Sequence, residues 1–339
     1  MQVSRGAPLA PLTTLRLGGP AARLAEATTA AELVEAVRTA GDELLLLGGG
    51  SNLVLADAGW PGTAVLIRSR GVTVDEDVLV AEAGEPWDEL VARTVAEGRA
   101  GLECLAGIPG LIGATPVQNV GAYGQEVAET ITRVDVYDRE LGAVRALTPA
   151  ECRFGYRDSL FKHTDRWVVL RVAFALARTG KSGPVRYPEL ARTLGVAVGE
   201  VAPLADVRSA VLELRRGKGM VLDPADRDTW SVGSFFTNPV LAPAELAAFE
   251  AQAGGPYPSW PAGSGTKLSA AWLIERAGFR KGYGGEAVRV SGKHTLALTH
   301  RGGGSTAELI ELAREIRAGV ADRFAVTLRP EPRLVGVQL

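Results

Sequence analysis

Apolar residues recur along the chain with two different spacings, which predict a mixture of helices and strands. Helical spacing occurs in five stretches, of which the longest runs from Thr306 to about Phe324; the others are residues 31–40, 86–101, 205–219 and 269–278. Continuous or alternating apolar residues predict strands at 43–47, 64–84, 131–147, 167–176, 287–300 and 324–339. The stretch 131–147 reads as a β-hairpin with its turn near Glu140–Gly142. Short strands mixed with few helices favour an α+β fold over a repeating βαβ array.

The composition is that of an ordinary globular protein. The chain has 339 residues, of which 46% are hydrophobic, and 37 basic against 39 acidic side chains give a net charge of −2. A length of this size predicts two or three domains, and the absence of a basic excess argues against nucleic acid as a partner. Neither a signal peptide nor a membrane span is evident. Cys104 and Cys152 lack the spacing of metal ligands, so we expect free thiols, no metal and a cytoplasmic protein.

Two glycine-rich loops are candidates for binding a phosphate-bearing cofactor. The first, LGGGSN (47–52), follows a predicted strand, and its glycines allow backbone N–H groups to approach an anion. It is not the dinucleotide fingerprint, because Leu53 stands where the third glycine is required and no helix follows. The second, GIPGLIGATPVQNVGAYG (107–124), has glycines at 107, 110 and 113 and little charge, so we expect it to fold inward at a strand end. Two ordinary tight turns are the alternative.

Two other motifs look functional but have simpler interpretations. GSGTKLS (263–269) lacks the full phosphate-loop pattern, so we expect Lys267 and Ser269 to begin the helix that follows. Ser234, in GSFFTNP, has no nucleophile motif around it, and the chain has only three histidines that could act as its base. The local sequence therefore favours a serine at a strand end that is hydrogen-bonded to backbone.

Six segments together resemble one enzyme family, the UDP-N-acetylenolpyruvoylglucosamine reductases, also called UDP-N-acetylmuramate dehydrogenases. In chain order they are LGGGSN, IPGLIGATPVQNVGAYG, CRFGYRDSLFK, GSFFTNP, KLSAAWLIERAGF and LRPEPRLVG. The resemblance implies an α+β flavoenzyme with a two-subdomain FAD-binding module of the vanillyl-alcohol-oxidase type and a C-terminal substrate domain. It implies non-covalent FAD, NADPH as hydride donor, and reduction of UDP-N-acetylglucosamine enolpyruvate to UDP-N-acetylmuramate for peptidoglycan.

The resemblance also implies roles for particular residues. FAD contacts are expected from the glycine loops, namely Gly48, Gly49, Gly50, Ser51, Asn52, Gly107, Ile108, Pro109, Gly110, Gly113, Ala114, Thr115, Gly121 and Tyr123. Reduction of an enolpyruvyl double bond pushes negative charge into the carboxylate and leaves a neighbouring carbon to be protonated. Arg157 suits the carboxylate because its guanidinium is always charged and can donate hydrogen bonds to both carboxylate oxygens. Glu331 can share this task if it keeps its proton, and Ser234 becomes the general acid rather than a nucleophile.

Substrate contacts are expected from Tyr123, Tyr187, Lys218, Asn238, Lys281 and His294. Tyr187 lies in a segment, 183–193, that resembles the subclass with a tyrosine-bearing loop over the substrate. Each of these residues has a structural alternative, such as a solvated lysine, a turn asparagine or a packed tyrosine. Two departures from the family pattern are His294, where glutamine is expected, and Thr237, where lysine is frequent.

The same resemblance predicts three domains: 1–69 and 70–217 bind FAD, 218–330 binds the UDP-sugar, and the terminal strand 331–339 packs on the first. We expect a monomer. Two alternatives remain open: an FAD-dependent alcohol oxidase on the same cofactor-binding fold, and a non-catalytic UDP-sugar or flavin-binding module. Against the oxidase, neither glycine loop contains a histidine or cysteine to tether flavin covalently.

Overall fold

The computed structural model describes residues 1–339, and their contacts divide the chain into two units. Unit 1 contains Met1–Ala7, Ala21–Gly49 and Pro61–Val221. Unit 2 contains Pro8–Pro20, Gly50–Trp60 and Leu222–Leu339. Both units are therefore assembled from segments distant in sequence, and each of the two is described separately below.

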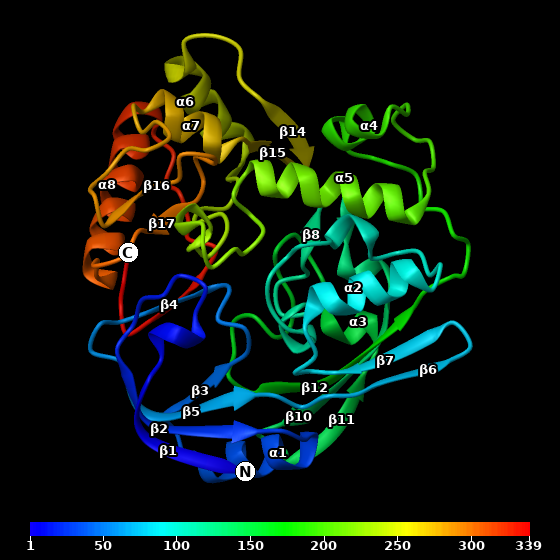
Figure 1. The fold of residues 1–339 in the computed structure, drawn as a ribbon. Coiled ribbons are helices and arrows are strands. Elements are labelled where there is room, and N and C mark those ends of the chain that lie inside the picture. The colour runs from blue at the N-terminus through cyan, green and yellow to red at the C-terminus, as the bar shows by residue number, and fades with distance from the viewer. The chain divides into compact units, whose positions relative to one another are not determined.

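The centre of unit 1 is an antiparallel five-stranded sheet in the order β11-β10-β12-β7-β6 (Figure 1). Its strands are β6 (Val72–Asp75), β7 (Val78–Glu82), β10 (Ile131–Asp138), β11 (Ala143–Leu147) and β12 (Trp167–Ala175). One face packs on α2 (Trp87–Ala96) and α5 (Leu204–Gly217), because the apolar stripes of these helices share a buried core with the sheet. This arrangement fixes the loop that follows α2, which carries the second glycine-rich motif.

The opposite face of that sheet, at Tyr137, Val168 and Leu170, packs in a second core with α1 (Ala30–Thr39). Thr29 caps α1 by accepting a hydrogen bond from the Glu32 backbone N–H. A four-stranded sheet shares this core, in the order β1 (Gln2–Pro8), β2 (Pro20–Ala27), β5 (Trp60–Ile67) and β3 (Leu44–Leu47). Strands β3 and β5 are parallel, and the first glycine loop leaves the end of β3.

The remaining elements of unit 1 are short. They are α3 (Pro149–Cys152), α4 (Pro188–Leu194), β8 (Gly121–Ala122), β9 (Gln125–Glu126) and 3₁₀ helices at Glu103–Leu105, Ile112–Ala114 and Val127–Glu129.

Unit 2 has one apolar core beneath three helices, α6 (Pro243–Ala253), α7 (Ala270–Arg276) and α8 (Thr306–Phe324). Its strands are β4 (Leu53–Leu55), β13 (Val240–Leu241), β14 (Ser259–Ala262), β15 (Gly265–Leu268), β16 (Val288–Val290), β17 (Leu298–His300) and β18 (Arg333–Val335); 3₁₀ helices lie at Ala10–Leu12 and Arg227–Thr229. Four fully buried phenylalanines, at 235, 236, 249 and 324, contribute large side chains to this core.

Most predicted helices and strands are confirmed, including the hairpin of β10 and β11 and the full extent of α8. Three expectations were wrong. The second glycine loop follows a 3₁₀ helix rather than a strand, and Lys267 lies on β15, so that Ser269 alone caps α7. The terminal strand is only β18, parallel to β4, because Pro330 and Pro332 cannot donate to a ladder. Both cysteines are free and buried. None of the helices combines the length and the apolar character that a membrane span requires.

Candidate active site

The two glycine loops meet backbone to backbone in unit 1. A Cβ atom on Gly49 would lie 2.9 Å from the Gly110 Cα, so no side chain fits at this point. The Gly110 carbonyl accepts a hydrogen bond from the Trp87 backbone N–H (3.1 Å), and the Gly107 N–H donates to the Asp88 Oδ1 (2.6 Å). The first turn of α2 therefore holds the second loop against the first.

These loops fit a dinucleotide cofactor such as FAD. Glycine backbone without Cβ atoms allows N–H groups to approach a pyrophosphate closely. Most of the segment 102–113 is buried or half-buried, as expected for a loop folded inward. Among the predicted contacts, Ala114 is exposed, and the buried Thr115 hydroxyl donates to the Ile112 carbonyl (2.8 Å) within the loop. Ile108 packs against the core, Pro109 is half-buried, and Gly113 lies against Ala83.

The rest of the first loop, Gly50–Asn52, belongs to unit 2. A Cβ on Gly50 would approach the Leu12 carbonyl oxygen to 2.3 Å. The Asn52 side chain donates to the Glu331 carbonyl (3.4 Å), and the Asn52 carbonyl accepts from the Arg333 N–H (3.0 Å). Ser51 is half-buried. Within unit 2 the predicted cofactor loop is therefore adjacent to the segment that carries Glu331.

Arg157 lies in a tight turn with an unusual backbone. The backbones of Gly155 and Asp158 are hydrogen-bonded to each other, and Arg157 between them has a left-handed φ of 52°. Its guanidinium Nη2 donates to the Gly121 carbonyl (2.6 Å). A Cβ on Gly121 would come within 3.0 Å of the Arg157 Nη1, so this glycine leaves space for the guanidinium. The structure thus brings two predicted site residues together, with Gly121 beside Arg157.

Ser234 lies in an irregular segment of unit 2 that is fixed by contacts with neighbouring segments. Ser234 forms an isolated β-bridge with Ala297, and Phe236 forms one with Pro330. Phe235 and Phe236 are fully buried, with ring centroids 5.1 Å apart. The Ser234 side chain is half-buried and its hydroxyl makes no hydrogen bond within the chain, so the expected bond to backbone is absent. The hydroxyl is available to a ligand.

Glu331 is attached directly to the Ser234 segment. Its backbone N–H donates to the Phe235 carbonyl at 2.9 Å. The residue is half-buried and follows Pro330. Two of the three predicted catalytic residues are therefore carried by hydrogen-bonded neighbouring segments of unit 2.

A cluster in unit 1 gathers three of the predicted substrate residues. The rings of Tyr123 and Tyr187 meet edge to face at 5.4 Å, and the Lys218 Nζ lies 5.8 Å from the Tyr123 ring centroid. Lys218 also forms an ion pair with Glu189, the second residue of α4, at 2.5 Å. Burial raises the pKa of Tyr123 to about 12, so its phenol is neutral at physiological pH.

Arg215 joins this cluster but was not singled out from the sequence. Burial lowers its pKa to about 10, which still leaves the guanidinium charged near neutral pH. Its Nε is buried without a hydrogen-bond partner and would lie 3.5 Å from a Cβ on Gly107. The pair Arg215–Arg216, two and three residues before Lys218, was the available signal, because a helix end with several cations suits an anion.

The three remaining predicted contacts are spread over unit 2. The Asn238 Oδ1 accepts from the Ala270 N–H (2.9 Å) at the start of α7, which is a structural use of that oxygen. The His294 Nδ1 accepts from the Leu296 N–H (3.1 Å). Lys281 is exposed and makes no ion pair. His294 begins the turn that ends at Ala297, and Ala297 forms a β-bridge with Ser234.

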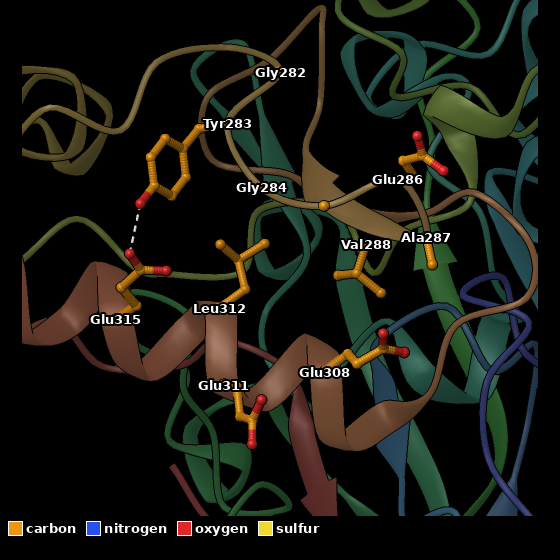
Figure 2. A pocket seen from close by; sticks show the side chains of 11 residues that line it. Gly282, Tyr283, Gly284, Glu286, Ala287, Val288, Glu308, Glu311, Leu312 and Glu315 are labelled. Atoms are coloured by element: carbon orange, nitrogen blue, oxygen red, sulfur yellow. Dashed lines mark hydrogen bonds between the residues drawn. The ribbon is translucent and has the colours of Figure 1, made fainter.

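A pocket of about 880 Å³ in unit 2 is a different feature (Figure 2). It is lined by residues 282–288 and by the exposed side of α8, and it contains four carboxylates, from Glu286, Glu308, Glu311 and Glu315. The Tyr283 hydroxyl donates to Glu315 there, as Figure 2 shows. None of the predicted site residues lines it. Four carboxylates repel the phosphates of a nucleotide-sugar or of NADPH, so this is not the substrate site.

Comparisons with known proteins support a cofactor site at the two glycine loops and a separate C-terminal domain in unit 2. Residues 21–148 match the model of an FAD-binding domain, and residues 223–335 match the C-terminal domain of UDP-N-acetylenolpyruvoylglucosamine reductase. The chain is 61% identical to the reductase of that name from Salinispora arenicola, covering 96% of this chain and 94% of the relative. It is 57% identical to the one from Streptomyces coelicolor, covering 100% and 92%. The crystal structure of the Thermus caldophilus reductase superimposes with a TM-score of 0.70 at 26% identity, over 99% of both chains.

The fold and the site define an FAD-binding oxidoreductase with a separate C-terminal domain. The chain belongs to the UDP-N-acetylenolpyruvoylglucosamine reductase family. It has the reductase activity of peptidoglycan precursor synthesis, with FAD as cofactor and NADPH as reductant. The predicted family, fold class, activity and cofactors are confirmed, and the oxidase and non-catalytic alternatives are not supported.

Proposed function

We propose that Arg157, Ser234 and Glu331 carry the reduction of UDP-N-acetylglucosamine enolpyruvate. When bound, FAD supplies the hydride for the terminal carbon of the double bond, after its own reduction by NADPH. The chain's residues then have two tasks, which are to bind the carboxylate of the substrate and to deliver one proton to the carbon that bears it. The product is the saturated lactyl ether of UDP-N-acetylmuramate.

Arg157 binds the carboxylate in this proposal. The Gly121 carbonyl accepts a hydrogen bond from the Arg157 Nη2 and so orients the guanidinium, whose planar, charged group suits a carboxylate. Negative charge grows on the carboxylate as hydride arrives, so a fixed cation stabilises the transition state more than the ground state. Glu331, if protonated, donates a further hydrogen bond to the same charge.

Ser234 donates the proton. Its hydroxyl has no partner in the chain, and the buried rings of Phe235 and Phe236 exclude water behind it. An enolate-like carbon is basic enough to accept a proton from a neutral hydroxyl, and such donors contribute about 10²–10⁴-fold in rate. The single observation that carries this assignment is the unpaired, half-buried hydroxyl on a segment tied to Glu331.

Anaerobic rapid mixing tests the assignment. The NADPH-reduced holoenzyme is mixed with UDP-N-acetylglucosamine enolpyruvate, and flavin reoxidation is followed at about 450 nm. Ser234→Ala is expected to slow reoxidation about 10²–10⁴-fold while NADPH reduces the flavin at the normal rate. Ser234→Cys, which keeps an acidic proton, is expected to retain part of the rate. Normal reoxidation in Ser234→Ala would remove Ser234 from the mechanism.

We propose Tyr123, Tyr187, Lys218, Asn238, Lys281 and His294 as substrate contacts, Lys218 and Lys281 being cations suited to a diphosphate. We propose for the fourteen glycine-loop residues the FAD contacts set out above, and for the chain the division 1–69, 70–217 and 218–330. The match of the C-terminal domain from residue 223 supports the last boundary. We also propose a monomer in the cytoplasm. Light scattering on the purified protein tests the oligomeric state.

A further inference from the structure

Lys162 is the last residue of the YRDSLFK segment, and its ammonium group donates a hydrogen bond of 2.5 Å to the backbone carbonyl of Arg157. Lys162 is one of only six lysines in the chain. Lys218 and Lys293 pair with carboxylates, and Lys181 and Lys281 are exposed without an ion pair. The half-buried Lys162 instead places its charge on a neutral backbone oxygen of the residue proposed to bind the substrate carboxylate.

That carbonyl needs a tether because of the conformation of Arg157. A residue other than glycine rarely adopts a positive φ, since its Cβ crowds the backbone, and such strain persists only where surrounding contacts enforce it. Four of the seven non-glycine residues with positive φ lie in two short segments, at Asn119, Tyr123, Arg153 and Arg157. Strain is thus concentrated around the proposed carboxylate site.

The two strained segments are tied to each other by side chains. The Asn119 Nδ2 donates to the Gly155 carbonyl (3.0 Å), and the buried Ser159 hydroxyl donates to the Val117 carbonyl (2.6 Å). These bonds hold the base of the Arg157 turn. The Lys162 ammonium and the Gly121 carbonyl then hold Arg157 itself, one at its backbone and the other at its guanidinium.

We propose that Lys162 is a positioning residue for the reaction: its ammonium holds the left-handed backbone of Arg157 and so aims the guanidinium at the substrate carboxylate. The proposal rests on the role proposed for Arg157. Without the tether, the backbone at residue 157 relaxes toward commoner conformations and the guanidinium moves. A displacement of about 1 Å in a positioning group can cost 10²-fold in rate.

Lys162→Met keeps the length of the side chain and removes the donor. In the holoenzyme, reoxidation of the reduced flavin by UDP-N-acetylglucosamine enolpyruvate is expected to slow about 30–100-fold. Flavin reduction by NADPH, and the affinity for UDP-N-acetylglucosamine, which lacks the enolpyruvyl group, are expected to stay within about twofold. Lys162→Arg retains a cationic donor and should recover most of the rate. Lys181→Met, at an exposed lysine without an ion pair, is the matched control.

A double-mutant cycle separates positioning from a general structural effect. If Lys162 acts through Arg157, then Lys162→Met should slow reoxidation little or not at all in a protein that already carries Arg157→Met. Additive losses in the double variant would overturn the proposal. So would normal reoxidation in Lys162→Met, or equal losses in both half-reactions.

Two further results need their own experiment or interpretation: loss of flavin from Lys162→Met, and normal reoxidation in Arg157→Met. If Lys162→Met does not retain flavin, Lys162→Ala is assayed with added methylamine, and a lack of both amine rescue and arginine rescue would overturn the proposal. If Arg157→Met itself reoxidises normally, the role of Arg157 fails, and the inference about Lys162 fails with it. An impaired Arg157→Met beside a normal Lys162→Met overturns the inference alone.

Discussion

The turn that carries Arg157 and the segment that carries Ser234 are held by different kinds of contact. Arg157 has a strained backbone in unit 1 and is fixed by polar bonds to Gly121 and Lys162. Ser234 lies in unit 2, between Ala297 and the Glu331 segment, and its neighbours Phe235 and Phe236 are part of the core. A charged group thus depends on polar tethers, while a neutral hydroxyl depends on packing. Substitutions beside the two residues should therefore have different consequences.

The largest expected effect is loss of stability beside Ser234. Phe235→Ala removes a side chain that is 0% exposed in the core of unit 2 and should lower the free energy of unfolding by about 3–5 kcal/mol. Chemical denaturation of the holoprotein measures it. Val240→Ala, at a position that is 45% exposed, should change the same quantity by less than about 0.5 kcal/mol. A Phe235→Ala protein as stable as the control would mean that packing does not hold this segment.

Substitutions beside Arg157 should lower the rate of flavin reoxidation rather than the stability of the protein. Gly121→Ala introduces a Cβ about 3.0 Å from the Arg157 Nη1, the Gln125 carbonyl oxygen and the Glu126 Cγ, so these neighbours, the guanidinium among them, must shift by a few tenths of an ångström. Reoxidation by the enolpyruvyl substrate should slow roughly 10-fold with little change in thermal midpoint. Gly285→Ala, where the nearest atom lies at an ordinary 3.6 Å, is the control. Equal rates in the two variants would show that the fit around the guanidinium is not critical.

A smaller effect is expected at Lys218, whose ammonium group forms an ion pair with Glu189 in the absence of substrate. Glu189→Gln should free the ammonium for the diphosphate and tighten binding of UDP-N-acetylglucosamine about 2–5-fold, since a partly exposed ion pair is worth at most about 1 kcal/mol. Titration calorimetry measures the affinity, with Glu213→Gln on the exposed side of α5 as control. Weaker binding in Glu189→Gln would indicate that Glu189 positions Lys218 instead of competing for it.

The smallest expected effect is a pH dependence of the free energy of unfolding, caused by His300 in unit 2. His300 Nε2 accepts from the Gly304 N–H and Nδ1 bonds the Leu15 carbonyl, so the ring is neutral, and burial lowers its pKa below the ordinary 6.5. The unfolded chain then binds more protons than the folded one near that pKa. The free energy of unfolding should consequently fall as pH drops below about 6.5 toward the folded pKa. Denaturation midpoints between about pH 5 and 7 should show this fall, and His300→Gln should flatten it. An unchanged pH profile in that variant would place the dependence elsewhere.

The sequence predicted the regular elements well where local signals agree. The helix Thr306–Phe324 was located at both ends, because Ser305 and Glu308 form a capping box before a clear apolar stripe. The hairpin of β10 and β11 followed from its alternating pattern and turn glycine. The prediction for Lys267 was wrong because its strand, β15, is stabilised by pairing with β13 and β14. Such pairing leaves no local pattern in the sequence.

The sequence supplied candidate site residues but not the contacts that support them. Motif resemblance singled out Arg157 and Ser234 as candidates. It gave no information on the tethers at Asn119 and Lys162, since those depend on a backbone carbonyl brought close by the fold. The same holds for Asn238, whose amide oxygen turns out to bond the start of α7. Contacts between side chain and backbone across loops leave no periodic signal in a sequence.

The central claim is that Arg157 binds the carboxylate whereas Ser234 only transfers the proton. Titration calorimetry of the oxidised holoenzyme with UDP-N-acetylglucosamine enolpyruvate and with UDP-N-acetylglucosamine tests it directly. In the wild-type protein and in Ser234→Ala, the enolpyruvyl ligand should bind more tightly than the ligand that lacks the carboxylate. In Arg157→Met that preference should disappear, because a charge-assisted bidentate contact is lost. Preference retained in Arg157→Met, or lost in Ser234→Ala, would contradict the account.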